Sequence, residues 1–390
     1  MREGWKRLSL GEASVQLADG SHNPPPGIEH SNYPMLSSKN IGFDHFDYDG
    51  PRYLSKGQFE EENKRTCISD GDVLLTIVGT VGRACCVSEP FTPFTLQRSV
   101  AVIKPRKDLL LSRFLMYHLT ALNSYFENEA KGVAQKGIYL KQLAKVPIFV
   151  PPISEQKHIV AELDLLQRII DKQKAQLKEL DTLAQSFFYD MFGDPLYNEK
   201  GWDVKLMGEV GTLQRGSGLS KQDLIDHGYP CILYGQIHTR FGAFTDHHIA
   251  CIPDELVHTA KIAHHGDVLM AITSEDVEGS CKSTAWLGDY DVAIGSDAAI
   301  YRHNLNSIYV SYYTQTQAFF NEKAKYAHGF KVTHISTKEI ATIPVLIPPS
   351  QLQELFAEKV VAIERQKASI NASIAETQKL FDYTMDKYFG

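Results

Sequence analysis

Two stretches of the sequence repeat apolar residues with the period of an amphipathic helix. Between residues 159 and 187 the apolar positions follow alternating steps of four and three, and residues 356–381 follow the same steps. This spacing places the apolar side chains on one seam of a helix, which is typical of a coiled coil. The predicted seam consists of Ile159, Leu163, Leu166, Ile170, Leu177, Leu180 and Phe187 in the first helix, and of Phe356, Val360, Ile363, Ile370, Ile374 and Phe381 in the second.

The length of these helices indicates that they pair with each other. A helix over residues 154–192 is about 58 Å long at 1.5 Å per residue, which exceeds the width of a domain of this size. We therefore favour a two-helix coiled coil over the alternative in which each helix packs only on its own domain. Polar Gln173, Lys367 and Thr377 interrupt the seam and are expected to set its register.

The chain contains one unit twice. Trp5 and Trp202 begin similar segments that lie 197 residues apart, and between the matched anchors the two halves differ widely. Because the period has the size of a domain, a domain followed by a helix is the repeated unit. The matched anchors are 71–74 with 266–269 (Gly-Asp-Val-Leu), 146–152 with 343–349 (a strand-like run ending in Pro-Pro), and 191–193 with 388–390 (ending in Phe-Gly).

The repeat defines the domain organisation. Gly390 matches Gly193, which directly precedes the second domain, so the second helix is expected to end near Trp5 and the two helices to run antiparallel. The predicted fold class is α+β, with two pseudo-symmetric mixed α/β domains separated by a long antiparallel two-helix coiled coil. The predicted segments are a first domain (1–153), a first long helix (154–193), a second domain (194–349) and a second long helix (350–390).

Within each domain we expect short strands punctuated by Gly, Pro, Asn and Asp residues, with short helices between them. A capping box formed by Ser350 and Gln353 is predicted at the start of the second long helix. The predicted strands include 72–78, 99–103 and 345–347, and the predicted short helices include 111–123 and 310–320.

The composition is that of a folded globular protein, with 43% hydrophobic and 22% charged residues. There is no run of about 18 apolar residues, and residues 1–11 lack the apolar core of a secretory signal. The six cysteines form no C-x-x-C pair, which argues against a structural zinc site and a disulfide framework. We therefore expect a cytoplasmic protein without a membrane span.

Charge is distributed unevenly along the chain, whose net charge is −7. Residues 1–153 contain 18 Lys and Arg against 16 Asp and Glu, whereas residues 194–349 contain 12 against 18. The second domain also contains ten of the fifteen histidines. Because neither domain is strongly basic, binding of a polyanion has to rely on local patches or on positive charge from a partner.

Three features have a partial likeness to catalytic or ligand-binding motifs. Residues 22–27 (His-Asn-Pro-Pro-Pro-Gly) lack the aromatic residue of the Asn-Pro-Pro-aromatic motif of DNA amino-methyltransferases, so we interpret them as a proline-stiffened loop. Residues 216–221 do not have P-loop spacing and are interpreted as a turn. The sequence predicts no catalytic residue and no metal site, and favours a binding protein. A solvated surface is the favoured interpretation of the histidines without metal-ligand spacing, His247, His248, His258, His264 and His265.

The order of these motifs, present twice at a fixed offset, resembles the specificity subunit of type I restriction–modification enzymes. The most telling segment is Pro151-Pro152-x-x-Glu155-Gln156-x-x-Ile159 followed by a long helix to 188 and by Met-Phe-Gly-Asp-Pro at 191–195; residues 348–390 are a weaker echo. The resemblance covers the whole chain. It implies two target-recognition domains that each read one part of an asymmetric bipartite site in double-stranded DNA.

The resemblance also implies the partners. Specificity subunits are non-catalytic and assemble with two methyltransferase subunits, and with motor–nuclease subunits for restriction. S-adenosylmethionine, ATP and magnesium would then belong to those partners, with no cofactor in this chain. Apolar helix residues outside the seam, namely Ile169, Phe188 and Val361, are candidates for docking the methyltransferase subunits. We expect the isolated chain to bind DNA weakly and in a salt-sensitive way, and the assembled complex to bind more tightly.

Base recognition needs polar and basic side chains on loops. We predict DNA contacts at residues in or beside Gly- and Pro-rich breaks, some of which are expected to be ordinary solvated positions. The candidates are Lys39, Asn40, Arg65, Thr80, Arg83, Gln97, Arg98 and Lys136 in the first domain, and Tyr234, Gln236, Ser274, Lys282, Ser296 and Lys331 in the second.

Two other classes of protein remain as alternatives. One is a stand-alone methyltransferase–nuclease, which the missing cofactor loop disfavours. The other is a duplicated adaptor or scaffold that binds proteins and not DNA.

Overall fold

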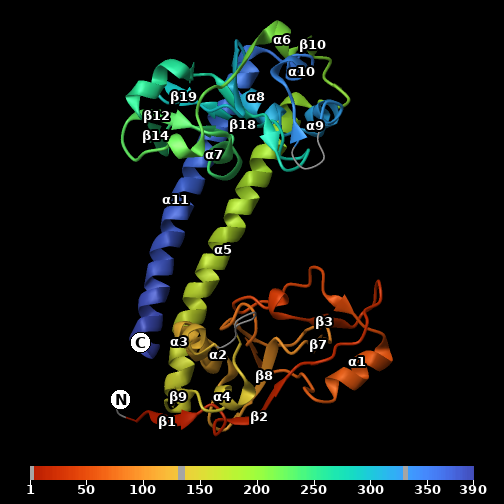
Figure 1. The fold of residues 1–390 in the computed structure, drawn as a ribbon, viewed down its shortest axis with the longest axis vertical. Coiled ribbons are helices and arrows are strands. Elements are labelled where there is room, and N and C mark those ends of the chain that lie inside the picture. The colour runs from red at the N-terminus through yellow and green to blue at the C-terminus, as the bar shows by residue number, and fades with distance from the viewer. Residues whose placement is uncertain (1–3, 131–136, 328–332) are drawn as a thin grey trace. The chain divides into compact units, whose positions relative to one another are not determined.

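The computed structural model describes residues 4–130, 137–327 and 333–390. The chain divides into two compact units, each built around its own sheets (Figure 1). Unit 1 comprises residues 1–173 and 373–390, and unit 2 comprises residues 174–372. Within the described ranges, no helix combines the length and the apolar character that a membrane crossing needs.

Unit 1 contains a central antiparallel sheet and two smaller sheets. The central sheet has the order β2-β8-β5-β6, and its middle strands β5 and β8 carry almost entirely buried side chains. A second sheet has the order β4-β3-β7, and β1 pairs with β9. The strands are β1 (Lys6–Ser9), β2 (Ser14–Asp19), β3 (Pro34–Leu36), β4 (Arg52–Tyr53), β5 (Val73–Thr76), β6 (Ala84–Cys86), β7 (Thr95–Leu96), β8 (Val100–Pro105) and β9 (Pro147–Val150).

Short helices of unit 1 cover the central sheet. Phe114 and Tyr117 of α2 are buried in one core with Val73 and Ile103 of the sheet and with Leu163 of α5. In Figure 1, α2 and α3 accordingly lie beside the first turns of α5. The helices are α1 (Lys56–Asn63), α2 (Ser112–Ala121), α3 (Asn123–Glu129) and α4 (Leu140–Leu143), with a 3-10 turn η1 at Ser38–Asn40.

Unit 2 repeats this plan, with one more strand in its central sheet and one more in its second sheet. Its central sheet has the order β11-β20-β16-β18-β13, its second sheet has the order β14-β12-β19-β15, and the two small pairs are β10-β22 and β17-β21. The strands are β10 (Asp203–Leu206), β11 (Gly211–Arg215), β12 (Tyr229–Ile232), β13 (Phe244–Thr245), β14 (Ala250–Ile252), β15 (Lys261–Ala263), β16 (Val268–Ala271), β17 (Thr273–Ser274), β18 (Lys282–Trp286), β19 (Val292–Ile294), β20 (Ala298–His303), β21 (Thr333–His334) and β22 (Pro344–Ile347).

Helices of unit 2 pack on the central sheet in the same way. Tyr309 of α8 and Phe319 of α9 share a buried core with Val268 and Tyr301 of the sheet. The single helix predicted over 310–320 is divided into α8 and α9 by the buried Thr314 and Thr316. The helices are α6 (Met207–Val210), α7 (Tyr234–Thr239), α8 (Ser307–Tyr313), α9 (Gln317–Ala324) and α10 (Thr337–Ile340), with 3-10 turns η2 (Lys221–Asp223) and η3 (Asp254–Thr259).

The two long helices are α5 (Ile153–Phe192) and α11 (Ser350–Phe389), and each unit contains a part of both. In unit 1, the Tyr388 hydroxyl of α11 donates to Glu162 Oε2 of α5 at 2.7 Å, and Gln173 Nε2 donates to Ser373 Oγ at 2.7 Å. Residue numbers rise along α5 as they fall along α11, so these parts are antiparallel. Phe389 lies 5.3 Å from the Phe114 ring, which itself contacts Trp5. The predicted return of the second helix toward Trp5 is therefore confirmed.

The parts of α5 and α11 in unit 2 are also antiparallel. Lys367 forms a 2.7 Å ion pair with Asp181 across the two helices, and the Phe188 ring lies 5.7 Å from Phe356. Lys367 thus bonds between the helices, as Gln173 does in unit 1, whereas the Thr377 hydroxyl donates to the Ser373 carbonyl of its own helix at 2.8 Å. Phe188 is buried against Tyr309, so the prediction that it docks a partner subunit is wrong. Each of the predicted seam residues is buried or half-buried.

The capping box predicted for Ser350 and Gln353 does not match the bonds that Gln353 makes. The Gln353 amide is 2% exposed; it donates to the carbonyl oxygen of Pro348 and accepts from the Asn306 N–H at 2.8 Å. Gln156 makes the equivalent bonds in unit 1, to the Pro151 carbonyl and from the Leu111 N–H. The repeated glutamine therefore fastens the first turn of each long helix to its own domain. This explains why glutamine recurs after each Pro-Pro pair.

A buried histidine in each unit makes folding sensitive to acid. Burial lowers the pKa of His118 and of His303 from 6.5 to about 4. Both side chains are neutral in the folded protein, whereas in the unfolded chain they bind a proton near pH 6.5. Their contribution to stability is complete above about pH 6.5 and is lost as the pH falls toward 4. We expect each histidine to lower the free energy of unfolding by about 2 kcal/mol at pH 5 relative to pH 7.

Urea unfolding at pH 7 and pH 5 checks this expectation. His118→Gln removes the titrating group and keeps an acceptor for the Phe149 N–H, which now binds His118 Nε2 at 2.9 Å. This variant should lose less stability between the two pH values than the parent protein does. His158→Gln, at an exposed position of α5, is the matched control and should behave as the parent. An equal acid loss in all three proteins would contradict the assignment.

Candidate nucleic-acid interface

The Gly-Asp-Val-Leu repeat fixes which residues of the two central sheets correspond. Val73 begins β5 and Val268 begins β16. Counting through the paired strands from this anchor, Asp19 at the end of β2 and Arg215 at the end of β11 occupy equivalent positions. Because these strands are antiparallel, the end of β2, the start of β8, the end of β5 and the start of β6 lie at one end of the sheet.

Hydrogen bonds join the loops at this end of the unit 1 sheet. The Gln97 N–H donates to the Leu36 carbonyl at 2.8 Å, and the Arg98 N–H donates to the Ser21 carbonyl at 2.9 Å. The short stretch before β8 is therefore bound on both sides by other loops. We call the joined segments the unit 1 loop cluster; it comprises residues 20–21, 36–41, 77–83 and 97–99.

Two bonds of this plan occur in both units. The Gly295 N–H donates to the Ile232 carbonyl at 3.1 Å, as Gln97 does to Leu36, and the Ser217 N–H donates to the Ile294 carbonyl at 3.3 Å, as the Ser21 N–H does to the Leu96 carbonyl at 2.7 Å. Two loop clusters with one backbone plan thus stand at equivalent ends of two sheets, while their side chains differ. The unit 2 loop cluster comprises residues 216–217, 232–237, 272–282 and 295–297.

The described residues that we predicted as DNA contacts lie in these two clusters, apart from Arg65. Lys136 and Lys331 lie outside the described residues. Contact with DNA stays a prediction for each candidate, but the structure shows which side chains reach solvent. Lys39, Arg65, Thr80, Arg83, Arg98, Tyr234 and Lys282 are exposed, Gln97, Gln236, Ser274 and Ser296 are half-buried, and Asn40 is buried.

Asn40 and Gln236 occupy equivalent positions and hold their own loops. Asn40 Oδ1 accepts from the Ser37 N–H at 3.0 Å, and Gln236 Oε1 accepts from the Leu233 N–H at 3.0 Å. The Asn40 amide nitrogen also donates to two carbonyl oxygens, those of Asp47 and Asp49. Asn40 is 4% exposed and its amide is occupied on both sides, so its bonds within the protein shape the loop.

Arg83 and Lys282 form a second equivalent pair, which is exposed. Arg83 directly precedes β6 and Lys282 is the first residue of β18. Lys282 Nζ donates to the His238 carbonyl at 2.7 Å, and Arg83 Nη1 approaches the Ile41 carbonyl at 3.5 Å. One cation therefore stands at the same place in each loop cluster, where it is able to bind phosphate or a base edge.

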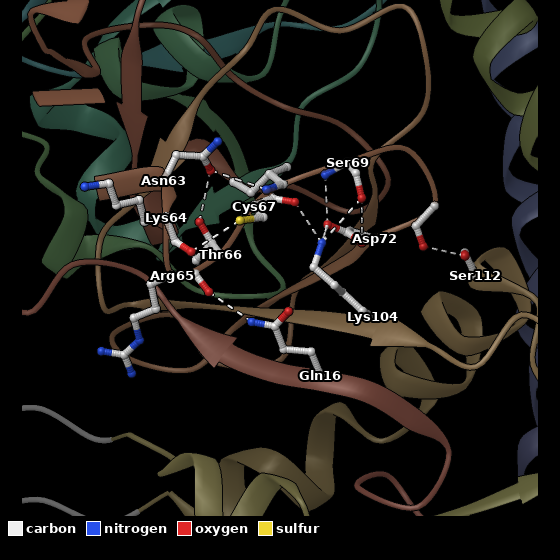
Figure 2. A network of polar contacts seen from close by, with 12 residues as sticks. Gln16, Asn63, Lys64, Arg65, Thr66, Cys67, Ser69, Asp72, Lys104 and Ser112 are labelled. Carbon is white, nitrogen blue, oxygen red and sulfur yellow. Dashed lines mark hydrogen bonds and ion pairs between the residues drawn. The ribbon is translucent and has the colours of Figure 1, made fainter. Parts of the chain in front are cut away.

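The opposite end of the unit 1 sheet holds the network shown in Figure 2. Lys104 Nζ contacts Asp72 Oδ2 at 2.5 Å and donates to the Cys67 carbonyl at 2.9 Å, while Gln16 Nε2 donates to the Arg65 carbonyl at 2.9 Å. These bonds fix the backbone of the loop between α1 and β5. Arg65 directs its guanidinium away from this network, toward Asp19. The network therefore positions Arg65.

The Gly-Asp pair has the same structural role in both units. Asp267 accepts from the His264 N–H at 2.8 Å and pairs with Arg302, and Asp72 accepts from the Ser69 N–H at 2.9 Å and pairs with Lys104. The pairing with Asp267 raises the pKa of the Arg302 guanidinium. The preceding glycines, at φ 86° and 90°, adopt the left-handed conformation that favours glycine. The repeated Gly-Asp motif therefore stabilises the turn before the central strand in each unit.

The histidines of the second domain bind separate partners. His264 Nδ1 lies 2.7 Å from Asp291, His265 Nδ1 lies 3.1 Å from the Gly288 carbonyl, and His248 Nδ1 lies 2.7 Å from the Tyr290 hydroxyl. Within the part of the chain that the structure describes, no group of three His, Cys, Asp or Glu side chains has metal-binding geometry.

Known proteins resemble this chain in sequence and in fold. A family model described as the type I restriction modification DNA specificity domain matches residues 29–182. The type I restriction enzyme MjaVIII specificity subunit of Methanocaldococcus jannaschii is 19% identical, over 77% of this chain and 74% of the relative. The EcoBI specificity subunit of Escherichia coli is 30% identical, over 36% of this chain and 31% of the relative.

The fold resemblance covers both halves. The crystal structure of the S subunit of a type I restriction–modification system from M. genitalium aligns with a TM-score of 0.56 and 15% identity, over 99% of this chain and 96% of that one. A chain from a structure on complex assembly and conformational transition of the type I system aligns with the same TM-score at 18% identity. In part of its sequence and in its fold, this chain is therefore similar to type I specificity subunits.

Sequence reasoning missed the residues that surround the predicted contacts. Asp19 and His22 in unit 1, and Arg215 and Asp297 in unit 2, lie in or beside the loop clusters and were not predicted. Aligning strand ends from the Gly-Asp-Val-Leu anchor would have paired residues 19 and 215, but the sequence does not show which residues lie across the sheet from them.

Proposed function

We propose that this chain reads an asymmetric bipartite site in double-stranded DNA for a type I restriction–modification complex. One observation carries the proposal: two loop clusters share a backbone plan and present different side chains at equivalent positions. Asp19 corresponds to Arg215, and Arg98 corresponds to Ser296. Similar scaffolds with different surfaces are suited to two different half-sites, because base edges are distinguished by the donors and acceptors that face them.

The charge of the chain agrees with a recognition role that depends on partners. An excess of six acidic over basic residues in 194–349 leaves little positive charge for phosphate contacts. We infer that two methyltransferase subunits bind the DNA together with this chain, and that motor–nuclease subunits join them for restriction. S-adenosylmethionine, ATP and magnesium would be held by those subunits, and this chain would contribute no catalytic residue.

Mapping of methylated bases tests this function. Cells that carry the gene should show methylation at a site with two specified parts and an indifferent gap, and cells without the gene should lack methylation at that site. Restoring the gene on a plasmid should restore the pattern. The assembled complex should also protect two separate patches of DNA in a footprint. Unchanged methylation after deletion, or one continuous specified sequence, would contradict the proposal.

A further inference from the structure

An arginine paired with an aspartate stands at the loop cluster of each unit, in opposite chain order. In unit 1 the strand end supplies the carboxylate, Asp19, which pairs with Arg65. In unit 2 the equivalent strand end supplies the arginine, Arg215, which pairs with Asp297 at 3.4 Å. Each half thus places one arginine–aspartate pair beside an equivalent turn. The arginine and the aspartate come from different positions of the chain in the two halves.

We propose that Arg65 and Arg215 each bind a guanine, one in each half of the DNA site. This inference rests on the proposed function and assigns the residues that determine part of its specificity. Guanine presents two acceptors, N7 and O6, in the major groove, and the planar guanidinium matches both with two parallel N–H bonds.

Both guanidinium groups are oriented by the protein and still open to solvent. The Arg65 side chain is 54% exposed and pairs with the carboxylate of Asp19, whose side chain is 10% exposed. His22 Nε2 lies 2.8 Å from the other carboxylate oxygen of Asp19. The Arg215 side chain is 52% exposed, and its Nε donates to the Ser296 carbonyl at 2.8 Å. Among the described residues, the remaining N–H groups of both side chains have no acceptor.

Two other arginines paired with aspartate have structural roles. Arg302 binds Asp267 through both Nε and Nη2. The equivalent pair in unit 1 is Lys104 with Asp72, so this position does not require a planar guanidinium. Arg113 uses Nε and Nη2 on Asp164 and also pairs with Asp44, whose side chain is 20% exposed. Arg302 lies at the opposite end of its sheet from the loop cluster, and Arg113 binds two carboxylates, so both hold the fold. Arg65 and Arg215 each pair with one carboxylate beside a loop cluster.

The aspartate partners favour a base over a phosphate as the ligand. Each arginine–aspartate pair is neutral overall, so it gains little from the charge of the DNA backbone. The carboxylate restricts the rotamers of the arginine, which reduces the entropy lost when a base is bound. In unit 2 this arrangement also explains how an acidic domain is able to recognise DNA: specificity comes from directed hydrogen bonds and not from net charge.

Further contacts hold the unit 2 pair in place. Asp297 Oδ1 also accepts from the Thr273 hydroxyl at 3.3 Å, and that hydroxyl lies 3.1 Å from His334 Nδ1. Thr273 and His334 belong to β17 and β21, which pair beside the loop cluster. We therefore assign Asp297, like Asp19, as a positioning residue and not as a base contact.

The test uses this chain assembled with its methyltransferase subunits and duplexes that contain the mapped site. Arg65→Ala should reduce methylation about 10- to 100-fold and relax the requirement for one guanine in one half-site. Arg215→Ala should do the same for the other half-site only. Arg65→Lys and Arg215→Lys keep the charge without the planar fork, so each should lose specificity nearly as much as the alanine variant. Arg106→Ala, which removes an exposed arginine paired with Asp108 at the opposite end of the sheet, should have no effect.

A modified base shows whether the contact is direct. Replacing the guanine by 7-deazaguanine removes the N7 acceptor and should weaken the parent complex, but should cost the Arg65→Ala complex nothing further. The inference would be overturned if 7-deazaguanine weakened the Arg65→Ala complex as much as the parent complex. Full activity of the lysine variants, an equal loss of methylation on all DNA sequences, or a half-site without guanine would also overturn it. A parent complex that methylates no bipartite site would refute the proposed function instead.

Discussion

Leu163→Lys should lower the free energy of unfolding of unit 1 by about 4 kcal/mol or more. Leu163 is fully buried on the seam of α5 and shares a core with Phe381 of α11 and with Phe114 of α2. The substitution removes apolar contacts and places an ammonium group among buried apolar side chains. Urea unfolding followed by tryptophan fluorescence, in which Trp5 reports on this core, measures the loss.

Leu165→Lys is the matched control for this experiment. Leu165 lies two residues further along the same helix and is 53% exposed, so the same change there should alter stability by no more than about 0.5 kcal/mol. Similar behaviour of the two variants would mean that α5 does not bury the seam face. Unit 2 should keep its own unfolding transition in both variants, because Leu163 has no part in its core.

Asp72→Asn should destabilise unit 1 by about 2–3 kcal/mol, since it removes the charge that compensates a largely buried lysine. Lys104 is 18% exposed and Asp72 5% in their side chains, and the lysine also holds the Cys67 carbonyl. The loop that carries Arg65 should therefore exchange its amide hydrogens faster than in the parent. Asp108→Asn breaks the exposed pair with Arg106 and is expected to change stability by at most about 1 kcal/mol.

An unchanged urea midpoint for Asp72→Asn would show that the Lys104–Asp72 pair contributes no net stability. A second readout separates folding from function. If the loop loosens while the domain stays folded, methylation by the assembled complex should fall in the half-site assigned to Arg65 and remain selective in the other. A loss spread over both half-sites would indicate general unfolding.

The long helices were predictable because their signal is local and repetitive. Each seam position follows from steps of four and three within one helix, and each of these side chains is at least half-buried in the structure. The antiparallel direction followed from the repeat, because the end of the second helix had to match the point before the second domain. No knowledge of distant pairing was needed for either prediction.

Side-chain roles were harder to predict because they depend on contacts between distant segments. The capping box was a sound local expectation, but Asn306 lies 47 residues from Gln353 and competes for its amide. Asn40 was selected as a polar loop residue, yet its loop folds around it. Arg215 gave no signal of its own, because its pairing with Asp297 depends on the register of β11 and β20.

The division of the chain has a consequence for the order in which the protein folds during synthesis. Unit 2 is one uninterrupted segment, whereas unit 1 needs residues 373–390 to cover Leu163 and Ile170. The ribosome therefore completes the second domain before it has made the piece that closes the first one. Until then the nascent first domain exposes an apolar helix face, which makes it the half that depends on chaperones and the half most prone to aggregate.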